Sequence, residues 1–240
     1  MKTSTMGHQN FTRSAVAIAL SVVACTGAQA QSAGDWILNI GWASINPSAS
    51  ISPLTSVGPA SPAFTPALKG ATASIASTST QTLGLLHMFT DNLGLEATIG
   101  IPPKMTVDVQ LTSGAHPGAA SAKALYPSFV GKYFFKTPQD GLRPYVGLGF
   151  TTASFNSVGV NSSDALVNGL GGTSASLSSS VAPLYTVGGI YRLDDKWSIN
   201  GSVSYVPLKS NATFVGTGTT TTGTLTINPT EYVIRLGYKF

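Results

Sequence analysis

The chain has 240 residues, of which 42% are hydrophobic and only 9% are charged, and its formal net charge is +4. This composition excludes a disordered tail, which needs low hydrophobicity, and a solvated helical bundle, because ordinary soluble domains carry roughly 25% charged residues. A membrane-spanning helix needs about 18 consecutive apolar residues, and no run after residue 30 is that long, so a β-barrel in a membrane is favoured.

The first thirty residues have the pattern of a secretory signal. Lys2 and Arg13 flank a polar start, and the short apolar run 14–23 follows it. The small residues Ala28 and Ala30 occupy the −3 and −1 positions of a signal-peptidase site. The run is too short to cross a membrane. We expect residues 1–30 to be a cleaved signal peptide and residues 31–240 to form a single domain.

The only cysteine, Cys25, lies inside this signal. Residues 22–25 also fit a lipoprotein cleavage box, which is the alternative interpretation of this region. A mature chain without cysteine suits an oxidising compartment and excludes thiolate metal sites and cysteine nucleophiles. Cleavage removes two of the 13 basic residues and none of the nine acidic ones, so the remaining net charge of +2 does not imply a nucleic-acid partner.

The recurring pattern in the mature chain is an alternation of apolar and polar residues with a period of two. Leu93, Leu95 and Ile99 share one face of such a segment, and Glu96 and Thr98 share the other. This alternation is typical of strands with a different environment on each face. We expect eight strands, at residues 35–45, 79–89, 93–102, 124–135, 143–155, 181–191, 197–207 and 229–240.

The connections between these segments alternate in length. The short ones are residues 91–92, 136–142 and 193–196. The long ones are residues 46–78, 103–123, 156–180 and 208–228. Short periplasmic turns and long extracellular loops are the plan of an outer-membrane barrel. The sequence therefore predicts an all-β fold, an eight-stranded antiparallel transmembrane β-barrel in the bacterial outer membrane.

Aromatic residues gather near the short turns, as in an interfacial girdle. They are Trp36, Tyr133, Phe134, Phe135, Tyr191, Trp197, Tyr238 and Phe240. The alternative all-β fold is a soluble sandwich secreted to the periplasm. Its loops would be expected to carry more charge, and its strands would need no girdle.

Three motifs point to a known family. They are TDNLGLE at residues 90–96, LRPYVGLG at 142–149 and LGYKF at 236–240. In order and spacing over the whole mature chain, the sequence resembles the OmpW family of outer-membrane proteins. The resemblance implies an eight-stranded barrel whose narrow interior admits small hydrophobic molecules. The family includes the AlkL proteins, which are linked to alkane uptake, and its route is thought to begin at the extracellular mouth and leave sideways into the bilayer.

The sequence departs from this family pattern at two places. Its long connections are richer in Ala, Pro, Ser and Thr, and the first is longer. Residues 181–183 (VAP) offer no aromatic gate at the start of the sixth strand, so gating is not carried over.

Inward-facing charges predict a polar layer that closes the barrel. If residues 103–123 turn near Gly114, Glu96 lies directly across from Lys132 on the neighbouring strand. Arg235 lies at a similar depth on the last strand. Buried charges need partners. We therefore expect Glu96, Lys132 and Arg235 to form an ion-paired plug in the periplasmic half, with a proton or ion relay as the alternative.

The same register places Pro102 opposite Tyr126 or Pro127, with Pro103 adjacent. Proline donates no ladder hydrogen bond and is normally kept out of central strands. Unsatisfied backbone groups are tolerated at membrane depth only where they line a cavity. We expect a lateral opening at Pro102 and Pro127, in the upper half of the barrel. Alternatively, the ladder has already ended and these prolines lie in a loop above the membrane.

Apolar residues in the upper barrel and in two long connections suggest a hydrophobic route. An eight-stranded barrel has room for side chains or one small ligand. The apolar residues of these two connections are Ile51, Leu54, Val57, Phe64, Leu68, Val158, Val160, Leu166, Val167 and Leu170. They would shelter a hydrophobic ligand from water, although flexible low-complexity loops explain them equally well. The candidate channel-lining residues are Ile45, Tyr126, Val130, Leu184, Val206 and Val233.

Other functions have weaker support. A barrel enzyme needs a base close to a nucleophile, and the mature chain offers only His87, near a short turn, and His116, in a long connection. We therefore expect no catalytic residue, no metal site and no cofactor. The expected partners are outer-membrane lipid and lipopolysaccharide, a small hydrophobic ligand, and the barrel-assembly machinery through Phe240, with no nucleic acid. A structural or adhesive barrel without a transport role is the alternative.

Overall fold

The structure is a computed structural model that describes residues 31–62, 68–111, 114–169 and 172–240. The expected signal peptide and its cleavage site, in residues 1–30, lie outside the described part of the chain. Within the described part, no helix is long and apolar enough to cross a membrane.

Eight antiparallel strands close into a barrel, which confirms the predicted fold. The order β1-β5-β6-β9-β10-β12-β13-β16 returns to β1, so every strand of the cylinder has two partners. Closure leaves no edge of unpaired backbone groups, as a strand in lipid requires. These strands are β1 (Trp36–Asn46), β5 (Thr78–Met88), β6 (Leu93–Gly100), β9 (Ser128–Phe134), β10 (Leu142–Val160), β12 (Ser180–Arg192), β13 (Trp197–Tyr205) and β16 (Thr230–Lys239).

Six of the eight strands begin and end within two residues of the predicted bounds. The fourth was predicted from residue 124, and this start was wrong, since β9 begins at Ser128. Pro127 stands immediately before it and has no N–H for a ladder. The fifth was predicted to end at residue 155, whereas β10 continues to Val160. Its last residues pair with β8 (Gly114–Leu125), a strand of the second long connection. No short-range pattern in the sequence indicates this pairing.

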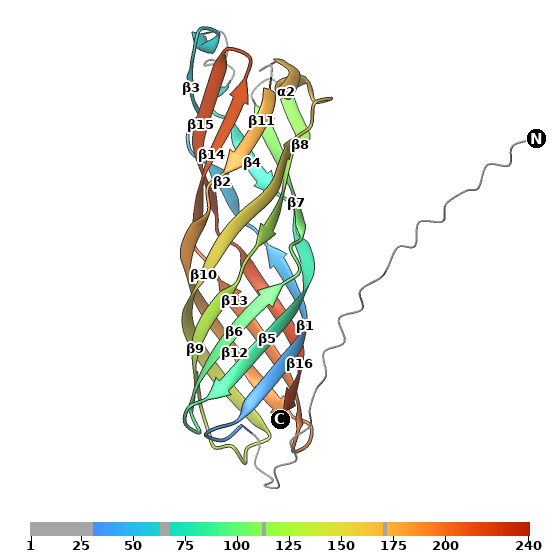
Figure 1. Cartoon of the computed structure of the whole chain (residues 1–240), viewed down its shortest axis with the longest axis vertical. Coiled ribbons are helices and arrows are strands. Elements are labelled where there is room, and N and C mark those ends of the chain that lie inside the picture. Colours follow the sequence, from blue (N-terminus) through green and yellow to red (C-terminus); the bar gives the residue numbers. More distant parts are fainter. Residues whose placement is uncertain (1–30, 63–67, 112–113, 170–171) are drawn as a thin grey trace, which may run out of the picture.

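Short turns join the strands at one end of the barrel, the lower end in Figure 1. Asn92 fastens one of them: its side-chain amide donates to the carbonyl oxygens of Phe134 at 2.7 Å and Lys136 at 3.0 Å. Asp194 shapes another, because its carboxylate accepts from the backbone N–H of Lys196 at 2.8 Å and Trp197 at 2.7 Å. These two donors hold the pKa of Asp194 below its usual value.

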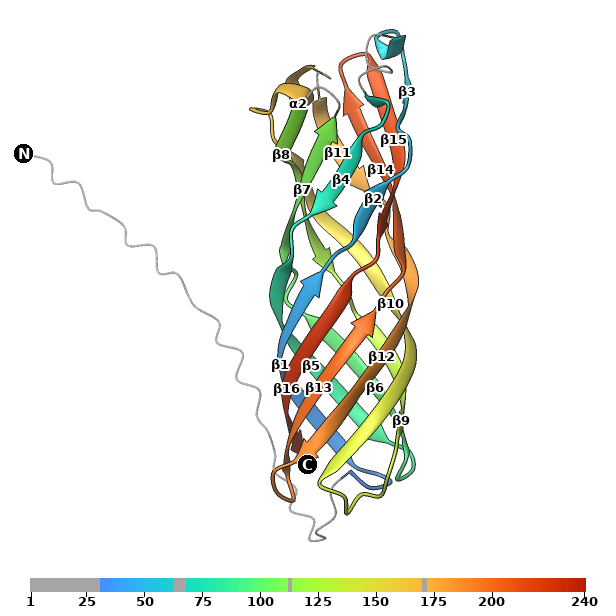
Figure 2. The same ribbon diagram turned by 180° about the vertical axis from the view of Figure 1, so that it is seen from behind.

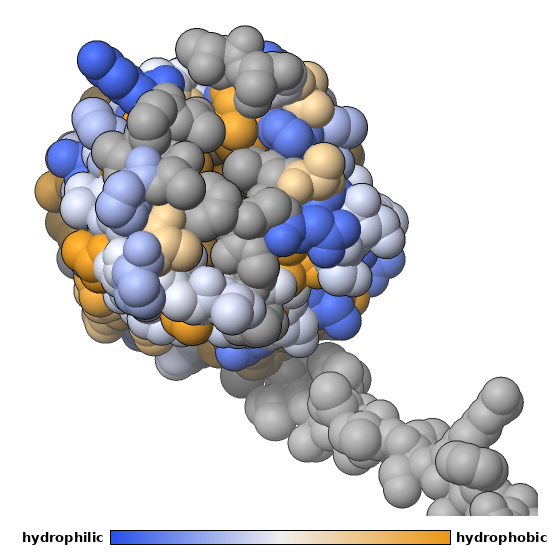
Figure 3. All heavy atoms as spheres, turned by 90° about the horizontal axis from the view of Figure 1, so that it is seen from above, coloured by the Kyte–Doolittle hydropathy of each residue, from blue (hydrophilic) through white to orange (hydrophobic). Residues whose placement is uncertain are grey.

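The four long connections continue the wall beyond the barrel at the opposite end, which we call the mouth end (Figures 1 and 2). They are built mainly of strands: β2 (Ala49–Ile51), β3 (Thr55–Val57), β4 (Thr72–Ile75), β7 (Lys104–Leu111), β8, β11 (Gly172–Leu177), β14 (Leu208–Gly216) and β15 (Thr219–Ile227). A short helix, α2 (Ala165–Gly169), lies among them. β4, β7 and β8 join the upper part of β10, and β11, β14, β15 and β2 form a second sheet, with β3 paired to β15. Figure 3 looks onto this end, where hydrophilic and hydrophobic residues are intermixed.

The barrel strands place large apolar side chains on the outside. Trp42, Leu148 and Ile234 are 59%, 62% and 61% exposed, whereas their neighbours along each strand turn inward. This inversion of a soluble protein's pattern is what a wall facing lipid requires. The weakly patterned strands follow it too, since Thr82 on β5 and Leu184 on β12 face inward.

The aromatic residues near the short turns are mostly on this outer face. Trp36, Tyr133, Phe135 and Trp197 are each between 41% and 47% exposed. The prediction that Phe134 belongs to the interfacial girdle was wrong, because its side chain is fully buried inside the barrel. Period-two alternation gives the reason: when Tyr133 and Phe135 face outward, the residue between them faces inward.

Candidate functional site

The barrel interior is stacked in layers, and the layer nearest the short turns centres on Arg143. This side chain is 2% exposed and donates from Nη1 to the carbonyl oxygen of Gln31 at 2.8 Å, and from Nη2 to that of Asp91. Its guanidinium also lies 5.2 Å from the ring centre of Phe134. Above it, six apolar side chains pack together: Ile37, Leu86, Met88, Phe134, Tyr145 and Ile190. Sequence reasoning missed Arg143, although its inward position beside Tyr145 follows from the alternation.

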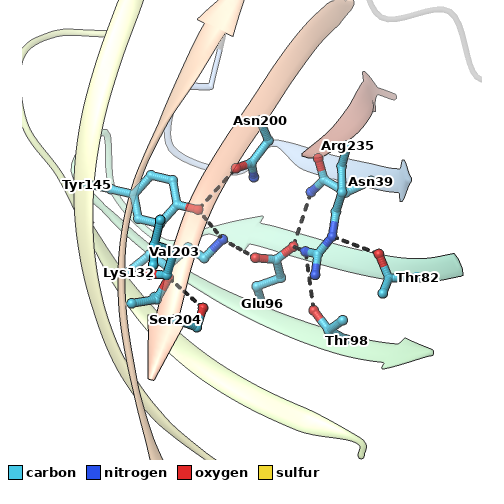
Figure 4. A network of polar contacts seen from close by, with 11 residues as sticks. Asn39, Thr82, Glu96, Thr98, Lys132, Tyr145, Asn200, Val203, Ser204 and Arg235 are labelled. Carbon is cyan, nitrogen blue, oxygen red and sulfur yellow. Dashed lines mark hydrogen bonds and ion pairs between the residues drawn. The ribbon is translucent and has the colours of Figure 1, made fainter. Parts of the chain in front are cut away.

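The next layer, the charged layer, consists of Glu96, Lys132 and Arg235. Glu96 Oε1 lies 2.7 Å from Arg235 Nη1, and Glu96 Oε2 forms an ion pair with Lys132 Nζ. The three side chains are 1%, 4% and 9% exposed. The structure therefore brings together three residues from three strands, β6, β9 and β16, as Figure 4 shows.

Neutral side chains complete the hydrogen bonding of the charged layer. Arg235 Nε donates to Thr82 Oγ1 at 3.1 Å, and Asn39 Nδ2 donates to Glu96 Oε1 at 3.4 Å. Lys132 Nζ donates to the hydroxyl of Tyr145 at 3.4 Å, which in turn donates to Asn200 Oδ1 at 3.0 Å. These contacts offset the large cost of removing charges from water.

The predicted register of this layer was wrong by two residues. Val130, not Lys132, lies directly across from Glu96. The reason lies in the β7–β8 hairpin: Leu111 pairs with Gly114, and the register then shifts at an irregularity between Val107 and Val109. Diagonal neighbours on an antiparallel pair are about 7–8 Å apart, which a long lysine side chain spans.

A glycine makes room for the charged layer. Gly84 on β5 faces the ion pair, and a Cβ at this position would lie 2.6 Å from Glu96 Oε1 and 3.1 Å from Arg235 Nη1. Any larger residue would push the carboxylate away from its partners. The compactness of the layer therefore depends on a residue with no charge, which sequence reasoning did not single out.

Directly above the charged layer lies a cavity of about 70 Å³, which we call the middle cavity. Its wall is rich in hydroxyl groups, from Thr80, Thr82, Thr98, Ser128, Thr151, Thr186, Ser202 and Ser204. One carboxyl group, that of Glu231, also reaches this wall above the charged layer. Glu231 shares the inward face of β16 with Val233 and Arg235, and sequence analysis gave it no role.

Above this cavity, the apolar collar fills the barrel. It consists of thirteen buried side chains: Ile45, Ala73, Ile75, Met105, Ala124, Val130, Ala153, Ala182, Leu184, Val206, Leu208, Leu225 and Ile227. Of the six predicted channel residues, Ile45, Val130, Leu184 and Val206 belong to the collar, and Tyr126 packs against it. Ile45, Tyr126, Val130, Leu184 and Val233 also line the middle cavity.

At the mouth end, a second cavity of about 80 Å³ opens among the connections, and we call it the upper cavity. Its lining is almost entirely apolar and includes Ile51, Leu54, Leu68, Val107, Val109, Val158, Val167, Phe214 and Leu225. Five of these were noted in the sequence as apolar residues of long connections. Phe64, Leu170 and the side chain of Leu166 lie outside what the structure describes. Val107, Val109, Phe214 and Leu225 were missed, because they belong to the two connections that were not inspected for apolar residues.

The barrel wall is interrupted between β6 and β9, and we call this place the wall interruption. The β6–β9 ladder ends at the pair Thr98–Ser128, and regular pairing resumes only at Lys104–Lys123 in the β7–β8 hairpin. Between them, one backbone–backbone hydrogen bond crosses, from the N–H of Ala124 to the carbonyl oxygen of Pro103 at 3.3 Å, and the Tyr126 hydroxyl donates to Met105 Sδ at 3.4 Å.

The edges of the wall interruption bond mainly to their outer neighbours. Ile101 donates to the carbonyl of Gln81 at 3.0 Å, and the carbonyl of Pro127 accepts from Thr152 at 3.0 Å. The predicted facing of Pro102 by Tyr126 or Pro127 was wrong. Instead, continuing the β6–β9 register by one step would put Pro127 opposite Ile99, and a residue without an N–H cannot extend the ladder there. Both edges reach the middle cavity, through Ile101 and Pro103 on one side and Ala124 and Tyr126 on the other.

The two mature-chain histidines line neither cavity. The His87 ring stacks on Trp36 with ring centres 4.3 Å apart. His116 Nδ1 lies 3.1 Å from Asp164 Oδ1, an acidic partner 48 residues away that the sequence did not indicate. Among the residues with described positions, no group of three or more His, Cys, Asp or Glu is arranged to hold a metal ion.

Comparison with known proteins agrees with this architecture. The model of the OmpW family matches residues 32–240. Outer membrane protein W of Vibrio cholerae is 32% identical over 179 residues, which are 69% of this chain and 76% of that protein. Outer membrane protein AlkL of Ectopseudomonas oleovorans is 23% identical over 180 residues, 75% of this chain and 71% of that protein.

Among solved structures, the crystal structure of the outer membrane protein OprG from Pseudomonas aeruginosa superimposes with a TM-score of 0.77 at 25% identity. The match covers 89% of this chain and 99% of that one. Both the sequence and the fold therefore lead to the same assignment, and the chain belongs to the OmpW family of bacterial outer-membrane β-barrel proteins.

Proposed function

We propose that this protein is a passive channel for small hydrophobic molecules, which enter at the extracellular mouth and leave sideways through the wall into the bilayer. One observation carries the proposal. An apolar lining runs from the upper cavity through the apolar collar to a middle cavity that has a charged floor and an interrupted wall. A hydrophobic molecule on this path has an apolar surface to follow and an interrupted wall to leave by.

The upper cavity is the first stop on the proposed route. Burial of apolar surface is favourable by about 25 cal/mol per Å², so a small hydrocarbon gains free energy on leaving water for a pocket lined by Leu54, Leu68 and Phe214. The apolar collar then offers similar contacts deeper in the barrel. Movement from the upper cavity into the collar needs no energy source, because it exchanges one apolar environment for another.

We assign the charged layer the role of a plug that closes the periplasmic half. Two features support it. The three charged side chains meet at one level of the barrel interior, and the six apolar side chains around Phe134 and the Arg143 side chain lie below them. A hydrocarbon that passed this level would have to separate Glu96 from its two cations. Such separation of a buried pair costs several kcal/mol, about 3–5 by mutation.

The wall interruption, with Pro102 and Pro127 at its edges, is the proposed exit. Along the β16–β1, β1–β5 and β10–β12 seams the wall is a continuous ladder, and a molecule would have to break several hydrogen bonds to cross it there. At the interruption a single backbone hydrogen bond spans the gap between the Thr98 and Lys104 pairs. Ile101, which lines the middle cavity, is also 60% exposed on the outside, so the same residue contacts both the cavity and the lipid.

The proposal also assigns partners and excludes catalysis. Outer-membrane lipid and lipopolysaccharide would surround the apolar wall, and the barrel-assembly machinery would recognise Phe240, which is 60% exposed at the end of β16. The channel needs no cofactor or catalytic residue. Neither histidine faces the route, since His87 lies against Trp36 and His116 bonds to Asp164.

Uptake of a labelled hydrocarbon tests the proposal. Cells with an intact lipopolysaccharide leaflet should take up labelled octane faster when they make the protein than when they carry an empty vector. Pro102→Val together with Pro127→Val should slow this uptake, because residues with an N–H can extend the ladder across the interruption. Pro144→Val is the matched control, since Pro144 is an exposed proline that pairs with Gly189 on one side and accepts from the N–H of Phe135 on the other.

Two results would count against the channel. Octane uptake equal to that of empty-vector cells would leave a structural or adhesive role for the barrel. Uptake that depends on the protein but is equal in wild type and in the double proline variant would place the exit elsewhere.

A further inference from the structure

We propose that the middle cavity binds the polar head of an amphiphilic substrate and that Glu231 selects for a neutral head that shares a hydrogen bond with it, above all a primary alcohol. This inference rests on the proposed channel function and names its preferred substrate class. It starts from a contrast: the collar and the upper cavity are apolar, whereas the cavity between the collar and the plug is not.

Glu231 is the feature that needs an explanation. It lies on β16 between Ile45 of β1 and Ser204 of β13, half-buried, where the apolar collar meets the hydroxyl-lined wall. Within the described part of the chain its carboxyl group has no hydrogen bond and no ion pair, while Glu96, one level below, has both. A half-buried carboxyl group without a protein partner is costly unless water or a ligand supplies one.

The hydroxyl groups around Glu231 are mostly already engaged. Thr151 donates to the carbonyl of Pro127 at 3.0 Å, and Ser204 donates to Thr186 at 3.0 Å. They make the cavity polar without occupying the carboxyl group. Ser128 and Ser202 of this wall keep free hydroxyl groups, but Glu231 is the one carboxyl group among the described residues lining the cavity that has no hydrogen bond or ion pair.

A hydroxyl group matches the Glu231 carboxyl group in either of its protonation states. An ionised carboxylate accepts the alcohol O–H, and a protonated one also donates to the alcohol oxygen. An alkane offers neither, and by displacing water it leaves the carboxyl unpaired. Sites built to hydrogen-bond a substrate hydroxyl reject the analogue that lacks it for this reason.

Charge balance favours a neutral head over an ionic one. Lys132 and Arg235 carry two positive charges and Glu96 one negative charge, so the charged layer has a net charge of +1. With Glu231 ionised, these four groups sum to zero. An ammonium or carboxylate head would leave an uncompensated charge in a narrow interior, whereas an alcohol leaves the balance unchanged.

The size of the cavity fits a head group and not a whole molecule. A volume of about 70 Å³ holds a hydroxyl and a few neighbouring atoms. The aliphatic tail would remain among collar residues such as Ile45, Val130 and Leu184, which border the same cavity. The wall interruption opens at this level, so the head would be held by Glu231 while the tail turns from the barrel axis towards the bilayer.

The test compares uptake of labelled 1-octanol and labelled octane by cells making the full chain, with empty-vector uptake subtracted. Wild type should favour octanol over octane. Glu231→Leu should lower the octanol-to-octane ratio about fivefold, the effect of losing one net hydrogen bond. Glu231→Gln should keep most of the preference, because an amide still pairs with a hydroxyl. Asp195→Asn is the control, an exposed acidic residue in a short turn. Folding of each variant is checked by its heat-modifiable gel shift.

The outcomes separate this inference from the channel itself. An octanol-to-octane ratio that is unchanged in Glu231→Leu, or equally reduced in Glu231→Gln and Glu231→Leu, overturns the role of Glu231 while octane uptake still supports the channel. Equal loss of octane and octanol uptake in a folded Glu231→Leu barrel shows a structural role and also overturns it. Octane and octanol uptake no faster than in empty-vector cells overturns both proposals together.

Discussion

The charged layer offers the most direct test of how the barrel is closed. Glu96 is the only anion that contacts both Lys132 and Arg235 among the described residues, and all three side chains are at most 9% exposed. Glu96→Gln keeps the size of the side chain and an oxygen acceptor. It removes the negative charge, so two buried cations of like charge are left facing each other.

The size of the effect follows from these contacts. Removal of one partner from a buried ion pair destabilises a protein by about 3–5 kcal/mol. Because the glutamine Oε1 can still accept the 2.7 Å hydrogen bond from Arg235, we expect the lower end of this range, about 3 kcal/mol. Repulsion between the two cations should also loosen the layer and let ions pass. The net charge of +2 should make this current anion-selective.

Two measurements follow the change. Urea unfolding of the barrel in lipid vesicles, read from the heat-modifiable gel shift, gives the loss of stability, and planar-bilayer recording gives the conductance. The double variant Glu96→Gln with Lys132→Met is the matched control, because it restores a net charge of +1. It should recover most of the stability and the closed state. Equal stability and conductance in wild type and Glu96→Gln would refute the idea that this layer is an ion-paired plug.

Two further predictions concern positions beside and below this layer. Gly84→Ala should lower stability by about 1–3 kcal/mol in the same urea assay, because its Cβ would lie 2.6 Å from Glu96 Oε1; Gly201→Ala, where a Cβ meets nothing within 4 Å, should be close to neutral. An equal effect of the two alanines would contradict the close packing. Two backbone donors lower the folded-state pKa of Asp194. Its contribution to the free energy of unfolding is therefore present above the unfolded-state pKa and is lost as pH falls through the folded-state pKa. Asp194→Ala should therefore be less stable than wild type at neutral pH, and this difference in the free energy of unfolding should shrink at acid pH. A difference that stays constant with pH would argue against the contribution of Asp194.

The sequence by itself determined the class of the fold and the facing of most strands. Side chains on a strand alternate between faces, so the period-two pattern around Glu96 and Arg235 separates lipid-facing from inward residues without any knowledge of partners. The same rule, applied strictly, would have placed Phe134 inside, where the structure has it. It also identified the depth at which charged side chains would meet.

Only the tertiary structure decided which residues meet across strands. Backbone hydrogen bonds form equally well in many registers, so the pairing of Glu96 with Val130 depends on the Leu111–Gly114 pair and on the register shift between Val107 and Val109, which no local pattern determines. The Glu96–Arg235 contact joins residues 139 positions apart, and the upper cavity brings Leu54 beside Phe214. Such contacts come from the closure of the cylinder, and a single sequence records which faces are apolar but not which of them will share one cavity.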